Sequence, residues 1–359
     1  MKKNILIASN TLCIGGIEKS LINLLKIIDY KKYNVDLFLE KVEGELLNEV
    51  PKNVNIIEYK PYNLKIKIIQ KTLNYLKQKR YKILLKNTYD TSICYATYSY
   101  PANFLTRISS NNKILFIHSD YTEILTEKEL RNFYDTRNLD SFNKIVFVSN
   151  EAKDHLLNYY KNIVDKSIVI NNIIDIEEIK NKSNLEQIKF NKNNINLLFV
   201  GRLEEKSKNI LFLLEQINIL KNKYKNIKLY ILGDGLDKNK YIKYINDNKL
   251  EKYIELLGQK NNPYPYIKAC DYIVLTSKYE GYPVIFSESI VLKKDIISTI
   301  KRSDEYTKIG DNFGFLITKS NFIKEIENIL DNKLHNNNTI DIKKINDLRI
   351  KEINNILNK

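Results

Sequence analysis

Glycine, cysteine and histidine are scarce in this sequence of 359 residues. Its 10 glycines are about 3% of the chain, below the usual figure of about 7%, so each is expected where the backbone requires it. The cysteines and histidines are few and far apart: Cys13, Cys94 and Cys270, and His118, His155 and His335. This pattern, with no C-x-x-C pair, argues against a disulfide framework or a structural metal site and predicts free thiols in a reducing compartment.

Long apolar runs are also absent. No stretch approaches the roughly 18 apolar residues of a membrane-spanning helix. The apolar run at 5–8 is shorter than the roughly 7–15 residues of a secretory signal core. The sequence therefore predicts a cytoplasmic protein, either soluble or peripheral on the inner face of the cytoplasmic membrane.

Positive charge, in contrast, is abundant. The chain has 58 Lys and Arg against 43 Asp and Glu, a formal net charge of +15. Such a balance favours an anionic partner, which can be nucleic acid, a membrane face or a phosphorylated small molecule. The hydrophobic content of 43% is that of an ordinary soluble chain, long enough at about 150 residues per domain for roughly two packed cores.

Short β-branched runs alternate with segments of helical period along the chain. We predict strands at about 4–8, 34–39, 54–58, 91–95, 113–117 and 143–148, and again at 195–200, 227–232, 254–257, 271–276, 295–299 and 314–318. This alternation predicts an α/β fold of two Rossmann-like, doubly wound domains that face a cleft. The expected divisions are an N-terminal domain at 1–175, a polar linker at 176–194, a second domain at 195–339 and a C-terminal helix at 340–359, which can cross back to the first domain.

The segment from Ser277 to Glu288 carries the strongest chemical signal. A predicted strand runs into a Glu280-Gly281 turn and then into a helix that begins near Pro283, with Glu288 eight residues after Glu280. Backbone N–H groups at such a helix start favour a phosphate, and the two carboxylates can bond a sugar and a ribose. The alternative is a capped helix with two incidental solvent-facing glutamates, and spacing alone does not decide between them.

Further motifs occur in a fixed order along the chain. They are Gly15-Gly16-Ile17-Glu18, Ile117-His118-Ser119, Val200-Gly201-Arg202-Leu203 followed by Lys206 and Lys208, Leu232-Gly233-Asp234-Gly235, and the stretch from Tyr266 to Asp271. Together with Glu280-x7-Glu288, this set resembles the retaining GT-B glycosyltransferases of family 4, especially those that build capsular and other bacterial surface polysaccharides. The chain departs from that family at Pro283, which stands where the family has glycine.

The resemblance implies roles for these residues. The donor would be a nucleotide-diphosphate sugar, UDP-sugar first of all, with its diphosphate neutralised by Arg202 and by Lys206 or Lys208. Glu288 would bond the ribose, and Glu280 would hold hydroxyls of a hexose-type sugar. His118 would lie against that sugar near the reacting carbon, although a histidine at a strand end is by itself more often structural. The other donor-binding residues implied are Gly15, Gly16, Gly233, Gly281, Tyr282 and Val284.

The chemistry implied by the resemblance uses neither a metal nor a cofactor. Front-face attack, with the leaving diphosphate accepting the proton of the acceptor, depends on positioning and charge stabilisation. The absence of an Asp-x-Asp pair agrees with this expectation. The acceptor implied is a glycan or a lipid-linked glycan of surface polysaccharide biosynthesis.

Residues 59–89 form a second informative segment, with nine Lys or Arg and no acidic residue. Apolar residues recur there at spacings of four and three, as in an amphipathic helix: Tyr62, Ile66, Ile69, Leu73 and Leu76. A basic amphipathic helix is typical of binding to an anionic membrane surface. The alternative is a helix docked on its own sheet with a solvated basic face.

Three other functions are alternatives to sugar transfer. A GT-B nucleotide-sugar epimerase would bind the same donor without an acceptor. A basic nucleic-acid-binding protein would show steep salt dependence, but no recognised nucleic-acid module is found and no nucleic-acid partner is expected. A pseudo-enzyme would keep only the fold, and the intact Glu280, Glu288 and Arg202 argue against that.

Overall fold

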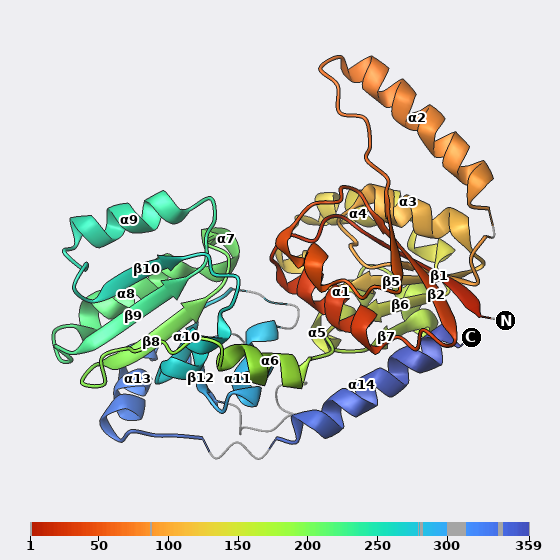
Figure 1. Cartoon of the computed structure of the whole chain (residues 1–359). Coiled ribbons are helices and arrows are strands. Elements are labelled where there is room, and N and C mark those ends of the chain that lie inside the picture. The colour runs from red at the N-terminus through yellow and green to blue at the C-terminus, as the bar shows by residue number, and fades with distance from the viewer. Residues whose placement is uncertain are drawn as a thin grey trace. The chain divides into compact units, whose positions relative to one another are not determined.

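The computed structural model describes residues 2–86, 88–278, 280, 283–299, 314–336 and 340–358. It divides the chain into two units (Figure 1). Unit 1 comprises Met1–Ile173 and Asn346–Lys359, and unit 2 comprises Ile174–Ile345.

Unit 1 is built on a parallel sheet of seven strands in the order β3-β2-β1-β4-β5-β6-β7. The strands are β1 (Lys3–Ser9), β2 (Tyr33–Leu39), β3 (Val54–Glu58), β4 (Thr91–Cys94), β5 (Asn112–Ile117), β6 (Lys144–Phe147) and β7 (Ser167–Val169). The helices are α1 (Gly16–Ile27), α2 (Lys67–Leu84), α3 (Tyr100–Ser109), α4 (Glu127–Arg137), α5 (Asn150–Leu157) and most of α14 (Ile342–Leu357). Short 3-10 turns are η1 (Glu45–Glu49), η2 (Tyr121–Glu123), η3 (Leu139–Ser141) and η4 (Lys161–Lys166).

Both faces of this sheet are buried. In β1, Ile5 and Ile7 belong to a core shared with α1 and α14, whereas Leu6 and Ala8 belong to a core shared with α3, α4 and α5. Successive side chains of a strand point to opposite faces, so a strand covered on both sides has an apolar residue at nearly every position. This explains why the strands are visible in the sequence as continuous apolar runs.

Unit 2 repeats the same topology with six parallel strands in the order β10-β9-β8-β11-β12-β13. The strands are β8 (Ile195–Val200), β9 (Ile227–Leu232), β10 (Ile254–Gly258), β11 (Tyr272–Leu275), β12 (Asp295–Ser298) and β13 (Gly314–Leu316). The helices are α6 (Ile176–Ser183), α7 (Glu205–Lys208), α8 (Ile210–Leu220), α9 (Lys238–Asp247), α10 (Tyr264–Ala269), α11 (Val284–Val291) and α13 (Phe322–Asp331). In each unit the winding reverses beside the first strand, at β1/β4 and at β8/β11, and ligands of such sheets bind beyond the carboxyl ends of the strands at this point.

The predicted α/β fold with two doubly wound domains is confirmed. All twelve predicted strands are present, with ends that differ by at most two residues. The sequence missed β7, because this half-buried strand of three residues is too short to show a periodic pattern.

The expected linker at 176–194 differs from the structure. Asp175 caps α6 by accepting the N–H of Glu178 (2.9 Å), and α6 packs against α10 and α11. Asn262 Nδ2 also donates to Lys182 O in α6 (2.8 Å). The first part of this polar stretch is therefore a helix that belongs to unit 2.

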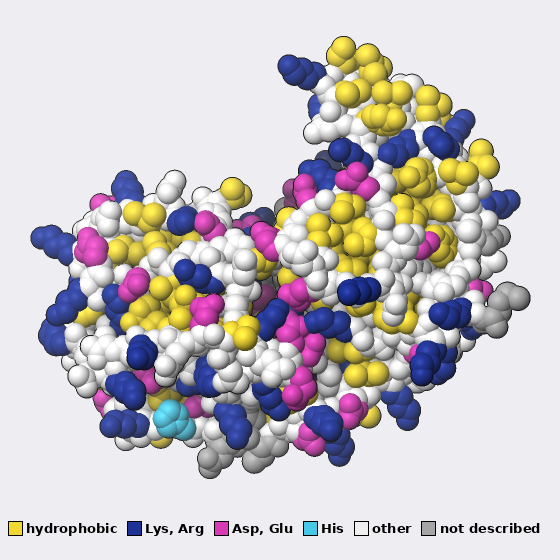
Figure 2. Space-filling model, viewed as in Figure 1, with side chains coloured by type: hydrophobic (Ala, Val, Ile, Leu, Met, Phe, Trp, Pro, Cys, Tyr) yellow, Lys and Arg dark blue, Asp and Glu magenta, His cyan; other side chains and the backbone are white. Residues whose placement is uncertain are grey.

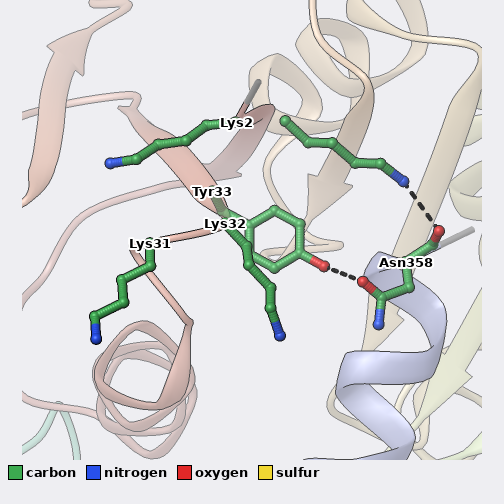
Figure 3. Close-up of a pocket in the computed structure, with 6 residues that line it drawn as sticks. Lys2, Lys31, Lys32, Tyr33 and Asn358 are labelled. Carbon is green, nitrogen blue, oxygen red and sulfur yellow. Dashed lines mark hydrogen bonds between the residues drawn. The ribbon is translucent and has the colours of Figure 1, made fainter.

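Helix α14 belongs to unit 1 from Asn346 onward. Arg349, only 3% exposed, donates to Asn172 O (2.8 Å). Beyond the end of the helix, Asn358 accepts hydrogen bonds from Tyr33 Oη (2.5 Å) and Lys3 Nζ (3.0 Å) (Figure 3). These residues line a groove of about 510 Å³ together with Lys2, Lys31 and Lys32. The groove lies at the amino ends of β1 and β2, the edge opposite to that expected for a ligand.

Helix α2 stands apart from the sheet of unit 1 (Figure 1), and none of its residues is buried. Figure 2 shows apolar and basic side chains together on this helix. In the part of the chain that the structure describes, no helix is both long and apolar enough to cross a bilayer.

We expect α14 to contribute to the stability of unit 1. Ile353→Ala should lower its free energy of unfolding by about 2–5 kcal/mol, because the side chain is 2% exposed within the core. Leu348→Ala, at a site that is 56% exposed on the same helix, should change it by less than about 0.5 kcal/mol. Hydrogen exchange of the β1 and β2 amides measures the difference, and equal exchange in the two variants would contradict this role.

Candidate active site

Glycine backbone lines the carboxyl edge of the unit 2 sheet. Gly201, which follows β8, donates to Leu232 O (3.0 Å), and Gly233, which follows β9, donates to Gly258 O (3.0 Å). Gly233 has a φ of +148°, and a Cβ there would lie 1.9 Å from Gly201 O. Only glycine fits this position, because the backbone of Gly233 packs directly against that of Gly201.

An ion pair joins two loops at the point where the unit 2 sheet reverses its winding. Lys208, at the end of α7, pairs with Glu280, which also accepts a hydrogen bond from Ser277 Oγ (2.8 Å). The lysine and glutamate side chains are 21% and 16% exposed. Lys278 N donates to Ser207 O (2.8 Å), which holds α7 against the loop after β11. Of the two lysines that the sequence left open, the structure brings this one to the glutamate.

Glu288 is buried inside unit 2. It lies in the second turn of α11, is 9% exposed and accepts a hydrogen bond from Tyr264 Oη (3.1 Å). A buried carboxylate is costly without such a partner. The interpretation of Glu280 and Glu288 as solvent-facing side chains is therefore wrong. Sequence reasoning did not single out Tyr264, because its partner is 24 residues away and no motif joins them.

The remaining predicted residues of unit 2 lie near these groups along the chain. Arg202 and Lys206 are exposed, on the loop after β8 and in α7. Val284 is half-buried and begins α11. Gly281 and Tyr282 lie outside the described residues.

In unit 1, the predicted glycine pair forms the start of α1. Gly15 is the N-cap residue and Gly16 the first residue of the helix. The neighbouring Glu18 is 9% exposed and accepts a hydrogen bond from Tyr98 Oη (2.9 Å). A Cβ at position 15 would lie 2.2 Å from Glu18 Oε2, so the glycine leaves room for this carboxylate. The sequence motif included Glu18 but did not reveal its partner.

His118 is buried at the end of β5. It is 8% exposed, and its ring centroid lies 4.5 Å from that of Tyr95 and 5.9 Å from that of Phe116. Burial lowers the pKa of His118 to about 3, so the ring is neutral at physiological pH. Within the described residues neither ring nitrogen has a hydrogen-bond partner of normal geometry, although the Asn172 side chain and the Tyr95 backbone lie close enough to oppose the lowering of the pKa. Buried ring nitrogens without full hydrogen bonds are rare and suit a group that bonds a ligand.

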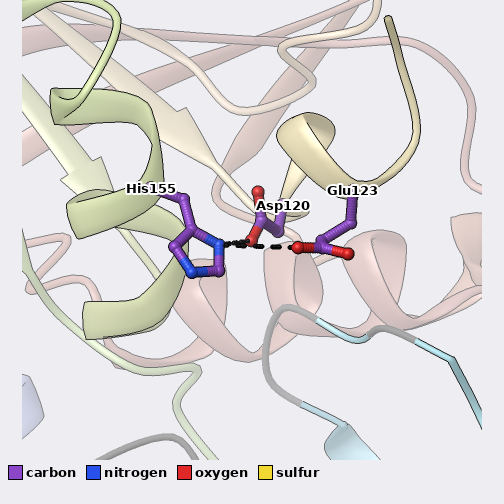
Figure 4. Close-up of side chains that lie close together, drawn as sticks. All are labelled: Asp120, Glu123 and His155. Carbon is purple, nitrogen blue, oxygen red and sulfur yellow. Dashed lines mark hydrogen bonds and ion pairs between the residues drawn. The ribbon is translucent and has the colours of Figure 1, made fainter.

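A second histidine lies in a small polar cluster of unit 1 (Figure 4). His155 Nδ1 is 2.6 Å from Asp120 Oδ2 and 4.0 Å from Glu123 Oε1. Partial burial lowers the pKa of His155, but hydrogen bonding to Asp120 and its charge outweigh this, so the pKa is raised. The three side chains are close enough to ligate a cation. However, Asp120 already bonds the histidine, and the pair joins α5 to the loop after β5.

Comparison with known proteins finds a family match within the second unit. Residues 194–332 match the family of glycosyl transferases group 1. The GT-B fold is confirmed by Alr3699/HepE of Anabaena, solved with UDP-glucose, at a TM-score of 0.77 over 98% of this chain and 100% of that one. Since the two sequences are 17% identical, this likeness shows the fold alone.

Relatives in sequence are also glycosyltransferases. The chain is 31% identical over 210 residues to glycosyltransferase MJ1059 of Methanocaldococcus jannaschii, covering 55% of this chain and 50% of the relative. It is 34% identical over 157 residues to N-acetylgalactosamine-N,N'-diacetylbacillosaminyl-diphospho-undecaprenol 4-alpha-N-acetylgalactosaminyltransferase of Campylobacter jejuni, covering 44% and 41%. It is 27% identical over 333 residues to the capsular polysaccharide biosynthesis glycosyltransferase CapH of Staphylococcus aureus, covering 89% of each. The matches to the first two thus span half or less of those relatives.

The close approach at Gly233 predicts a difference between two glycine variants. Gly233→Ala should lower the free energy of unfolding by about 2–3 kcal/mol or more, because the backbone strain and the contact with Gly201 O add together. Gly258→Ala should lower it by only about 1 kcal/mol, because its φ is +70° and nothing lies within 4 Å of the added Cβ. Urea unfolding measures both variants. Equal losses of unfolding free energy would contradict the close contact between a Cβ at position 233 and Gly201 O.

Burial of His118 predicts a pH-dependent loss of stability. An unfolded histidine protonates near pH 6.5, whereas folded His118 stays neutral down to about pH 3. The unfolded state therefore binds more protons in this window, and stability falls as the pH drops through it. Between pH 7.5 and 5.5 the wild type should lose about 1 kcal/mol more than His118→Gln. Parallel pH profiles of unfolding for the two proteins would contradict a neutral buried imidazole.

Proposed function

We propose that this chain, which carries a glycosyl transferases group 1 domain in a GT-B fold, is a retaining glycosyltransferase that uses a UDP-sugar donor. It would transfer a hexose-type sugar to a glycan or lipid-linked glycan in surface polysaccharide biosynthesis. The observation that carries this proposal is the arrangement at the β8/β11 edge of unit 2. There, a half-buried lysine–glutamate pair lies beside Gly201, and a buried glutamate, Glu288, lies in the helix that follows the loop of Glu280.

This arrangement fits a nucleotide-diphosphate sugar. The guanidinium of Arg202 and the ammonium of Lys208 would neutralise the diphosphate. Glu288, held by Tyr264, would accept hydrogen bonds from the ribose, and Glu280 would hold hydroxyls of the sugar. Lys208 is the more suitable of the two lysines that the sequence left open, because it lies beside Glu280 and Gly201.

The proposed reaction forms one bond and breaks one bond on the same face of the sugar. The acceptor hydroxyl oxygen bonds the anomeric carbon while the bond from that carbon to the diphosphate oxygen breaks, and the leaving diphosphate takes the hydroxyl proton. Neutral His118 would hydrogen-bond the sugar near the reacting carbon. We propose that no metal or cofactor takes part, since the positive charges of the chain supply the charge stabilisation.

The acceptor class rests on the relatives. One is named for capsular polysaccharide biosynthesis and another for an undecaprenol-linked saccharide. An acceptor of the second kind would place this enzyme at the inner face of the cytoplasmic membrane.

Donor binding is tested by thermal unfolding with UDP, GDP, ADP, CMP and a short DNA duplex. UDP at about a hundred times its Kd should raise the Tm by about 5–10 °C. Glu288→Gln should weaken UDP binding about 10- to 150-fold, since each hydrogen bond to a charged group contributes about 1.5–3 kcal/mol. The matched control Glu215→Gln, at an exposed site on α8, should bind as the wild type does.

The outcomes separate the competing functions. Unchanged UDP binding by Glu288→Gln would remove that residue from the donor site. A Tm shift with DNA alone that disappears in salt would exclude the donor site as a whole. Conversion of the sugar in a UDP-sugar without any transfer product would identify an epimerase.

A further inference from the structure

One side of α2 packs against the rest of unit 1. Leu73, Lys77 and Tyr81, spaced by four residues, are half-buried and lie along this side. Lys77 Nζ donates to Lys60 O (2.8 Å) and lies 4.9 Å from the ring centroid of Tyr59. The Tyr81 ring meets the same tyrosine edge to face, with centroids 5.0 Å apart. These contacts anchor the helix and fix which side of it faces outward.

The outward side of α2 carries a row of large apolar residues. Tyr75 and Leu76 follow Ile68 by seven and eight residues and precede Ile83 by eight and seven, so the four lie within about 100° of one another on the helix surface. In chain order, their exposed fractions are 78%, 55%, 53% and 80%. A single exposed apolar residue needs no explanation, but a contiguous row marks an interaction surface. The exposed face of the helix is therefore apolar as well as basic.

Basic residues lie beside and within this row, without any acidic neighbour. Lys67, Lys71, Lys79, Arg80 and Lys82 are all exposed on α2. No Asp or Glu occurs between positions 59 and 89. The surface therefore pairs apolar side chains with uncompensated positive charge along the 18 residues of the helix, a length of about 27 Å.

We propose that this outward face of α2 docks on anionic lipid headgroups, with the helix axis in the plane of the bilayer surface. The four apolar side chains would enter the boundary between headgroups and acyl chains, and the flanking lysines would contact lipid phosphates. Nucleic acid fits less well, because the aliphatic Ile68 and Ile83 offer it neither charge nor stacking. The inference rests on the proposed function for its purpose, since a lipid-linked acceptor lies at such a surface.

Insertion is tested with a tryptophan probe, because the chain contains no tryptophan. The emission of Ile68→Trp should shift to the blue on vesicles of phosphatidylcholine mixed with phosphatidylglycerol, and brominated acyl chains should quench it. Vesicles of phosphatidylcholine alone should give neither effect. The matched control is Leu236→Trp, at a site 98% exposed in unit 2, which should show no shift on either kind of vesicle.

The charge requirement is tested by vesicle sedimentation. Replacement of Lys67, Lys71, Lys79 and Lys82 by glutamine should weaken binding to the anionic vesicles by about a hundredfold or more. The same replacement at Lys225, Lys240, Lys243 and Lys252 removes equal charge from exposed sites of unit 2 and should change binding much less. Added salt should weaken binding of the wild type.

The apolar requirement has its own pair of variants. The double variant Ile68→Ser and Ile83→Ser should lose binding to the anionic vesicles. The matched control, Leu185→Ser and Leu236→Ser in unit 2, should bind them as the wild type does. All variants should keep the wild-type Tm and its shift with UDP, so loss of vesicle binding cannot be attributed to unfolding.

Four results would overturn the proposal. They are equal binding to neutral and anionic vesicles, no tryptophan shift on the anionic vesicles, a shift with duplex DNA instead, and a stable dimer without lipid that the two-serine variant of α2 abolishes. Vesicle binding without any UDP-dependent Tm shift would reject the proposed donor site but retain this docking surface.

Discussion

A parallel sheet must be covered on both faces, and most of this structure follows from that constraint. The helices that cover the two faces require the chain to wind first one way and then the other from a central strand. This reversal places β8 beside β11, so the segments that follow them meet at one edge. Lys208 and Glu280, 72 residues apart, form their ion pair there. The candidate donor site is thus a consequence of the winding.

The polar groups at these edges are largely buried, which is costly unless each has a partner. Glu280 is bonded by Lys208 and Ser277, and Glu288 by Tyr264. His118 avoids the cost of burying a charge, because burial lowers its pKa and the ring stays neutral. Groups held in this way would be positioned for the proposed donor, and transfer by charge stabilisation depends on such positioning.

Helix α2 departs from the rule that apolar helix faces are covered. Its inner side contacts Tyr59 and Lys60. The large apolar side chains on its outer side stay exposed among the described residues. The excess of positive charge seen in the composition is also concentrated there, since residues 59–89 hold nine of the 58 basic residues and no acidic one. A lipid surface would satisfy both features at once.

The sequence alone determined the strand positions, the repeat of the fold and the candidates His118, Glu280 and Glu288. It could do so because apolar periodicity and short motifs are local properties of the chain. The tertiary structure decided which lysine meets Glu280, that Tyr264 supports Glu288, and that the helical start of 176–194 belongs to unit 2. It also decided which side of α2 is left outside. Each of these depends on contacts between segments far apart in the chain, and no local pattern encodes such contacts.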